Sequence, residues 1–304
     1  MSALIRIATR SSALALAQTE LAIKTIKSQY PNAAIEVIKL TTKADKNSQT
    51  PIHEIGGKGI FVKELEQALL EQKADIAVHS VKDMPSKLTA ELSLPCILPR
   101  SLPHDILISK QGLSLTKLAP GSIVGTSSIR RELQLKLMRP DLIYKPIRGN
   151  VGTRIKKIGH GYDAIILAYA GIARLQLTEH ITENFKLSEM LPAAGQAAIG
   201  LQCLTQNDKI MNMLTTLDHK ASNVCITAER SAMENLGAHC FAPVAAYAEH
   251  AEDKIKLHAK VFTNTGHIQT TQTGPCTAAY DIGKEAAVEL IHQGALDIIS
   301  KAKE

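Results

Sequence analysis

A lysine and an aspartate stand together where a buried strand is expected to end. The apolar run 76–78 (Ile-Ala-Val) predicts a short strand, Pro85 prevents it from continuing, and Lys82 and Asp83 lie between them. In open α/β sheets, ligands bind just outside the carboxyl ends of the strands. Lys82 is therefore a candidate anion-binding residue and Asp83 a candidate acid/base. For an isolated pair, a solvated Lys-Asp turn is the commoner explanation.

Arginines also gather at predicted strand ends. Six of the ten arginines lie between Arg130 and Arg174. The strand-end set consists of Arg10, Arg130, Arg131, Arg148, Arg154 and Arg174. Arginine suits bidentate recognition of carboxylates and phosphates. One such arginine is easily a surface charge, but the repeated placement predicts a cleft that binds a small polyanion.

Hydroxyl side chains accompany these cations at predicted helix starts. Ser12 precedes a helical pattern that begins at Ala13, while Thr126 and Ser128 precede a helix that opens with two arginines. Capping hydroxyls and free N–H groups at a helix start favour a bound anion. An ordinary helix cap is the alternative for Ser12, and by itself it is the more common one.

The order of elements predicts an α/β fold with two doubly wound domains around a cleft, followed by a small α+β domain with an antiparallel sheet. Domain 1 is expected at residues 1–99, with 197–217 returning to it, and domain 2 at 103–193. Successive strands and then a helix predict domain 3 at 221–304. The segment 42–59 is polar and contains three glycines, which is typical of a functional lid or a disordered segment. Its Gly-Gly-Lys-Gly stretch lacks the Ser or Thr of a phosphate-binding loop.

Composition excludes several classes of protein. No apolar run approaches the ~18 residues of a membrane span, and the N-terminus lacks the pattern of a signal peptide. The five cysteines form no CxxC pair, which favours reduced thiols in a cytoplasmic protein and no metal site. The net charge of +6 suggests nucleic acid, but aromatic residues make up 3% and no basic block occurs. A small anionic ligand explains the charge better.

Six motifs together resemble the porphobilinogen deaminase (hydroxymethylbilane synthase) family. They begin at Arg6, Gly56, Asp75, Val124, Arg148 and Leu191, and read RIATR, GGKGIFVKEL, DIAVHSVKD, VGTSSIRR, RGNVGTR and LPAAGQ. The match runs in register from Arg6 to about Tyr247 and more loosely to the C-terminus. Several long motifs in the right order make this resemblance highly specific.

The resemblance implies a cytoplasmic, three-domain monomer with periplasmic-binding-protein-like domains 1 and 2. It implies a transferase of haem (tetrapyrrole, porphyrin) biosynthesis that condenses four porphobilinogen molecules head-to-tail, with loss of ammonia, to hydroxymethylbilane. The expected ligands are porphobilinogen, its oligopyrrole intermediates and a dipyrromethane cofactor. Neither nucleic acid nor a membrane is an expected partner.

The resemblance also assigns roles to single residues. Cys240 would carry the cofactor through a thioether, and Asp83 would be the catalytic carboxylate. Cofactor-binding residues would be Lys82, Asp83, Thr126, Ser128, Arg130, Arg131 and Arg148. Substrate-binding residues would be Arg10, Ser12, Arg148, Arg154, Arg174 and Phe61, with Asp45 and Lys58 in the lid.

The chain departs from the family pattern at a few positions. Ala238 and His239 replace the two glycines before Cys240, which bears on the geometry of the cofactor loop, and we hypothesise that His239 assists formation of the Cys240 thiolate. Ala13 and Ala197 stand where the family often has Pro and usually has Gly. None of these changes removes a charged group. The competing hypothesis is a non-enzymatic binding module for a small anion. Such a module would need neither Cys240 nor Asp83.

Overall fold

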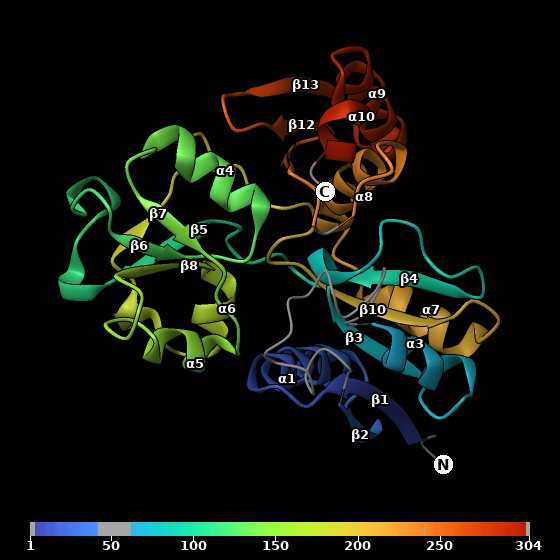
Figure 1. The fold of residues 1–304 in the computed structure, drawn as a ribbon. Coiled ribbons are helices and arrows are strands. Elements are labelled where there is room, and N and C mark those ends of the chain that lie inside the picture. The colour runs from blue at the N-terminus through green and yellow to red at the C-terminus, as the bar shows by residue number, and fades with distance from the viewer. Residues whose placement is uncertain (1–3, 42–61, 240, 302–304) are drawn as a thin grey trace. The chain divides into compact units, whose positions relative to one another are not determined.

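The computed structural model of the chain describes residues 4–41, 62–239 and 241–301 (Figure 1). Contacts divide it into two compact units, residues 1–101 with 198–223, and residues 102–197 with 224–304. Each unit has its own cores, and we describe them separately. The division of the second unit into two domains, as the sequence suggests, stays a prediction.

Unit 1 is built on a five-stranded sheet with the order β2-β1-β3-β10-β4. Its strands are β1 (Leu4–Arg10), β2 (Ala34–Leu40), β3 (Ile76–Ser80), β4 (Leu92–Ile97) and β10 (Ile199–Leu204). β1 runs parallel to β2 and β3, whereas β10 is antiparallel to β3 and β4. The parallel register Ile7↔Ile76 places the carboxyl ends of β1 and β3 at one edge of the sheet.

Helices cover both faces of this sheet. α1 (Ala13–Gln29) and α7 (Asp208–Leu217) pack Ile26 and Leu214 against one apolar face. α3 (Lys63–Leu70) packs Leu65 and Leu69 against the other. β3 is therefore buried on both sides, which explains why its first three residues form a continuous apolar run and not an alternating pattern.

Unit 2 contains a second five-stranded sheet, in the order β7-β6-β8-β5-β9. It comprises β5 (Asp105–Ser109), β6 (Ile123–Gly125), β7 (Ile143–Lys145), β8 (Ala164–Ala168) and β9 (Glu183–Asn184). β6 is parallel to β7 and β8, and β5 is antiparallel to β8 and β9. The helices α4 (Ile129–Met138), α5 (Val151–Lys156) and α6 (Tyr169–Arg174) follow β6, β7 and β8 in turn.

The end of the chain adds the antiparallel sheet β11-β12-β13 to unit 2. Its strands are β11 (Val244–Ala251), β12 (Lys254–Phe262) and β13 (His267–Pro275), and the helices are α8 (Lys220–Asn235), α9 (Ala279–His292) and α10 (Ala295–Lys301). One core joins Leu257 of the sheet to Ala228 of α8 and Ala286 of α9. The predicted fold class, two α/β sheets followed by a small antiparallel sheet with helices, is confirmed.

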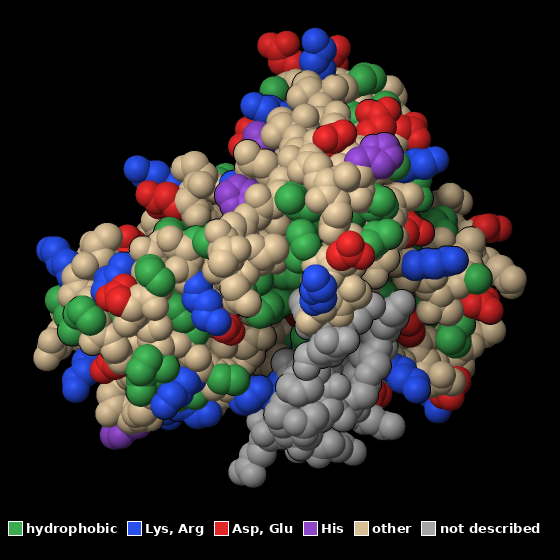
Figure 2. All heavy atoms as spheres, turned by 45° about the horizontal axis from the view of Figure 1, so that its top comes forward, with side chains coloured by type: hydrophobic (Ala, Val, Ile, Leu, Met, Phe, Trp, Pro, Cys, Tyr) green, Lys and Arg blue, Asp and Glu red, His purple; other side chains and the backbone are tan. Residues whose placement is uncertain are grey.

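Surface properties agree with this architecture. In the described ranges, none of the helices combines the length and the apolar composition of a membrane span. On the face drawn in Figure 2, Lys and Arg side chains lie scattered among acidic, apolar and other side chains. The buried cations of the described residues are Arg130 and Arg131, which follow the strand β6.

Candidate functional site

Lys82 and Asp83 occupy a single 3₁₀ turn, Val81–Asp83, directly after β3. The turn is anchored by Val81, whose side chain is buried and whose N–H donates to the Ala198 carbonyl at 3.1 Å. Lys82 and Asp83 are partly buried. No side chain among the described residues bonds to the carboxylate of Asp83, so this group is available to a ligand.

Polar contacts from three other elements fix the end of β3. Gln18 of α1 donates to the Ser80 hydroxyl at 2.7 Å. The buried His79 bonds through Nε2 to Oε1 of Gln202 at 2.9 Å, and Gln202 Nε2 donates to Glu66 at 2.9 Å. Because the Gln202 oxygen can only accept, His79 carries a proton on Nε2. The backbone that holds Asp83 is therefore tied to α1, α3 and β10.

Arg10 ends β1, the parallel neighbour of β3, so its backbone lies at the same edge of the sheet as the Lys82–Asp83 turn. Ser12 is the N-cap of α1, and its hydroxyl accepts from the Ala15 N–H at 3.3 Å. Ser12 therefore acts as an ordinary helix cap, which is the more common of the two interpretations of this residue. Ala13 is the first residue of this helix, the position where proline is favoured.

In unit 2, Arg130 and Arg131 are buried at the start of α4 and share one carboxylate, Asp105. Arg130 Nη1 lies 2.8 Å from Asp105 Oδ2, and Arg131 Nη2 lies 2.8 Å from Oδ1. Burial alone would raise the pKa of Asp105, but the charges of the two arginines hold it well below its usual range. The three groups together keep one net positive charge inside the protein.

The hydroxyls around this helix start differ from the expectation. Ser128 is the N-cap of α4, but its side chain makes no capping bond, so the predicted role of its hydroxyl as a cap is wrong. Thr126 Oγ1, which is buried, accepts from the Ser128 N–H at 3.2 Å. Ser127 instead bonds through its hydroxyl to both the carbonyl and the N–H of Ile147. These bonds join the loop after β6 to the loop after β7.

Arg148 and Arg154 belong to the loop and helix after β7. Asn150 caps α5 by accepting from the Thr153 N–H at 2.9 Å. Arg154 Nε donates to the Gly149 carbonyl at 2.7 Å, and Gly149 has φ +109°, where a side chain would also meet Thr153. Burial lowers the pKa of Arg148. The glycine of this motif is therefore required by backbone conformation.

Arg174 ends α6, after β8, and donates through Nη2 to the Ala197 carbonyl at 2.6 Å. Burial lowers the pKa of Arg174 to about 10. Ala197 has φ +72°, a conformation that favours glycine, which gives a physical reason for the glycine expected there. The segment Gln196–Ala197 thus contacts both Arg131 and Arg174.

Some predicted site residues lie outside the described residues. These are Asp45, Lys58 and Phe61 of the 42–59 lid and its end, and the cofactor cysteine Cys240. Their assigned roles stay predictions. Two residues that the sequence analysis missed, Asp105 and Gln196, lie at the centre of the arginine cluster.

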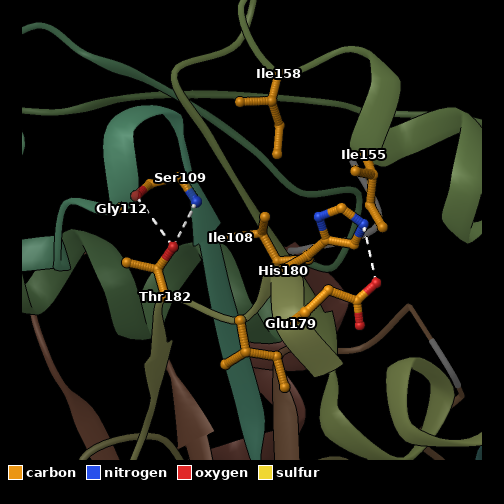
Figure 3. Close-up of a pocket in the computed structure, with 9 residues that line it drawn as sticks. Ile108, Ser109, Gly112, Ile155, Ile158, Glu179, His180 and Thr182 are labelled. Carbon is orange, nitrogen blue, oxygen red and sulfur yellow. Dashed lines mark hydrogen bonds and ion pairs between the residues drawn. The ribbon is translucent and has the colours of Figure 1, made fainter. Parts of the chain in front are cut away.

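A separate pocket lies at the other end of β5 (Figure 3). Ile108 and Ser109, at the carboxyl end of the strand, line it together with Ile155, His180 and Thr182. Asp105 is the first residue of β5, about 13 Å from Ser109 along an extended strand. None of the predicted site residues lines this pocket, so it is distinct from the arginine cluster.

Comparison with known proteins agrees with the motifs. The model of the porphobilinogen deaminase dipyromethane cofactor binding domain matches residues 5–212, and that of the porphobilinogen deaminase C-terminal domain matches residues 223–292. The chain belongs to the porphobilinogen deaminase family. Porphobilinogen deaminases of Bordetella parapertussis and Bordetella bronchiseptica are each 42% identical over 300 residues, which is 98% of this chain and 96% of theirs. A solved methionine-binding protein, MetQ, aligns with 70% of this chain and 89% of its own at 11% identity, with a TM-score of 0.46.

As a member of the porphobilinogen deaminase family, the chain is a transferase that polymerises porphobilinogen to hydroxymethylbilane with a dipyrromethane cofactor. The charges of unit 2 fit such a ligand, whose pyrrole rings carry carboxylate side chains. Arg130, Arg131 and Arg174 provide three guanidiniums, and Asp105 is their only carboxylate partner in the described part of the chain. A bound carboxylate would compensate the remaining charge.

Proposed function

We propose that Asp83 is the catalytic carboxylate of this enzyme and that Cys240 holds the dipyrromethane through a thioether. The observation that carries the first assignment is the state of Asp83: a partly buried carboxylate on a turn fixed from three sides, with no bonding partner in the described ranges. A carboxylate used only for structure would be expected to have a donor inside the protein. Cys240 is assigned on the family resemblance.

The chemistry assigns Asp83 several proton transfers. It protonates the amine that leaves porphobilinogen, stabilises the positive charge that develops on the pyrrole, and assists deprotonation after the carbon–carbon bond forms. One carboxylate beside a pyrrole N–H can serve all three steps. The dipyrromethane, when bound, would supply the terminal pyrrole carbon to which the first unit is added.

Carboxylate binding is the role that we propose for the cations and their neighbours. Lys82, Arg10 and Ser12 of unit 1 and Thr126, Ser128, Arg130, Arg131, Arg148, Arg154 and Arg174 of unit 2 bind acetate and propionate groups of cofactor and substrate. The lowered pKa of Arg174 supports this assignment, because burial makes that cation costly until an anion joins it. Asp45, Lys58 and Phe61 are assigned to the lid and to ring stacking on the resemblance alone.

His239 is proposed to assist the loading of Cys240. The Phe241 N–H donates to His239 Nδ1 at 3.2 Å, so the neutral imidazole carries its proton on Nε2. A donor on the residue next to a cysteine favours its thiolate. We also propose that the enzyme is a cytoplasmic monomer. Its cysteines form no CxxC pair, which favours a reducing compartment. A dimer in sedimentation analysis would contradict the monomer, and recovery outside the cytoplasmic fraction would contradict the localisation.

The variant Asp83→Asn tests the catalytic assignment. Asn has the same shape and removes only the charge and the acid/base function. Because Asp83 has no described partner, the thermal midpoint should change little, while ammonia release from porphobilinogen should fall by about 10²–10⁴-fold. Turnover within about tenfold of the parent enzyme would move the acid/base role to another residue.

A further inference from the structure

Asp105 is completely buried, and its two oxygens are divided between two arginines of α4. Oδ1 accepts from Arg131 Nε at 3.0 Å and from Arg131 Nη2 at 2.8 Å. Oδ2 forms an ion pair with Arg130 Nη1 at 2.8 Å. A buried charge is costly unless it is paired and hydrogen-bonded. The excess positive charge of this cluster, two arginines on one carboxylate, is therefore unfavourable unless it has a function.

The guanidinium of Arg131 is hydrogen-bonded almost entirely to protein acceptors. Besides its two bonds to Asp105, its Nη1 donates to the Ile166 carbonyl at 3.3 Å, and Nη2 lies 3.5 Å from Gln196 Oε1. All three nitrogens of the guanidinium are thus engaged with protein acceptors. Few of its five N–H groups are left for a ligand.

Arg130 differs from its neighbour. Its Nη1 donates to the Leu191 carbonyl at 2.7 Å and also meets Asp105. Its Nε is buried and has no hydrogen-bond partner in the described part of the chain. A buried donor left without an acceptor costs about 1–3 kcal/mol, and such groups in native proteins usually have a functional reason.

Gln196 fixes the orientation of the shared carboxylate. Its Nε2 donates to Asp105 Oδ1 at 2.9 Å and to the Pro103 carbonyl at 2.6 Å. The adjacent Gly195 N–H donates to the buried Glu229 of α8 at 2.7 Å. The carboxylate therefore cannot rotate without breaking contacts to two segments of unit 2, the start of α4 and the segment that carries Gln196.

We propose that Asp105 is a positioning residue of this enzyme: it holds Arg131 against the protein, which makes the part of Arg131 in ligand binding an indirect one, and it orients Arg130 as the guanidinium that binds a carboxylate of the tethered pyrrole chain. The two arginines are thus unequal, although they are adjacent. The inference rests on the proposed assignment of this cluster to the cofactor. One net charge on the three groups matches one bound carboxylate.

The first test compares Asp105→Asn with Asp141→Asn. The asparagine oxygen can still accept from Arg131, but its NH₂ then faces Arg130 Nη1, donor against donor. Asp141 pairs with Arg139 at the far end of the same helix and is the control, because Asp141 is exposed and lies outside the arginine cluster. Cofactor-free protein is produced in cells that make no porphobilinogen, then mixed with porphobilinogen, and the adduct is followed by intact-protein mass spectrometry. Loading should slow at least about tenfold in Asp105→Asn, as expected for a misplaced bond to a charged group, and stay unchanged in Asp141→Asn.

A second pair, Arg130→Gln and Arg131→Gln, keeps the proposal falsifiable if Asp105→Asn does not fold. Arg130→Gln should lower the thermal midpoint of the cofactor-free protein less than Arg131→Gln does, and it should lose most of the rise in midpoint that loading produces. Arg131→Gln should lower the midpoint of the cofactor-free protein itself. Equal behaviour of the two variants, the reverse order, or loading of Asp105→Asn within twofold of the parent overturns the proposal. An absence of adduct in the parent protein would instead refute the assignment of Cys240.

Discussion

Replacing Arg174 by methionine should stabilise the cofactor-free protein while it impairs the enzyme. The Arg174 cation has no carboxylate partner in the described ranges, and burial lowers its pKa from the usual arginine range to about 10. At ~1.4 kcal/mol for each pH unit, this drop corresponds to a cost of about 3 kcal/mol for keeping the cation. Because the pKa is lowered on folding, the cost is present at neutral pH and is relieved only as the pH rises above about 10.

The substitution also removes the hydrogen bond from Arg174 to the Ala197 carbonyl, which we set at about 2 kcal/mol for a charged donor. The net gain is about 1 kcal/mol, or about 1–2 °C in the thermal midpoint of a protein of this size. Methionine keeps the length of the side chain, so no large cavity is expected. Porphobilinogen turnover should fall, because a carboxylate ligand loses its guanidinium.

The assay is thermal unfolding in the Cys240→Ala background, where no tethered pyrroles contribute. Arg139→Met is the control, because Arg139 is paired with Asp141 at 2.6 Å and its pKa is raised, chiefly by that hydrogen bond. This control should lower the midpoint. If Arg174→Met lowers the midpoint as much as Arg139→Met, the charge of Arg174 is compensated inside the protein and the reasoning fails.

Three further outcomes are expected. Burial raises the pKa of Cys96 to about 12 and that of Cys203 to about 11, so both thiols stay protonated at pH 8. Both should resist alkylation by iodoacetamide at that pH, whereas the partly exposed Cys276 should react. Labelling of Cys96 in the native protein would contradict this prediction. Gly283→Ala should lower the thermal midpoint, because the new Cβ would clash with the Ala228 carbonyl of α8. This clash should outweigh the better helix propensity of alanine. A raised midpoint would show that α9 can move away from α8. His239→Gly should slow cofactor loading, and loading to the full extent at an unchanged rate would exclude a role for the imidazole.

The strand-end residues were predictable from sequence because β strands impose a simple geometry. β1 and β3 are parallel neighbours, so Arg10 and the Lys82–Asp83 turn follow strands that end at the same edge. The same holds in unit 2, where β6 has β7 and β8 as parallel neighbours. An apolar run followed by charged residues was enough to locate these positions.

The partners of the arginines were not predictable in this way. Asp105 contacts Arg131 across 26 residues and Gln196 across 91 residues. Both contacts depend on β5 running antiparallel to β8, which brings the start of β5 to the carboxyl end of β8. A charged residue that opens an apolar strand suggests a buried partner, but only the sheet topology identifies it. The capping bond expected of Ser128 was not predictable either. Whether that bond forms depends on the backbone geometry after β6, and in the structure it is absent.

The covalent state of Cys240 tests the central claim most directly. Intact-protein mass spectrometry of the enzyme produced in cells that make porphobilinogen should show an adduct of two pyrrole units, and the same protein with Cys240→Ala should have the mass of its polypeptide alone. An adduct that persists in Cys240→Ala, or a parent protein of unmodified mass that releases no ammonia from porphobilinogen, would contradict the account.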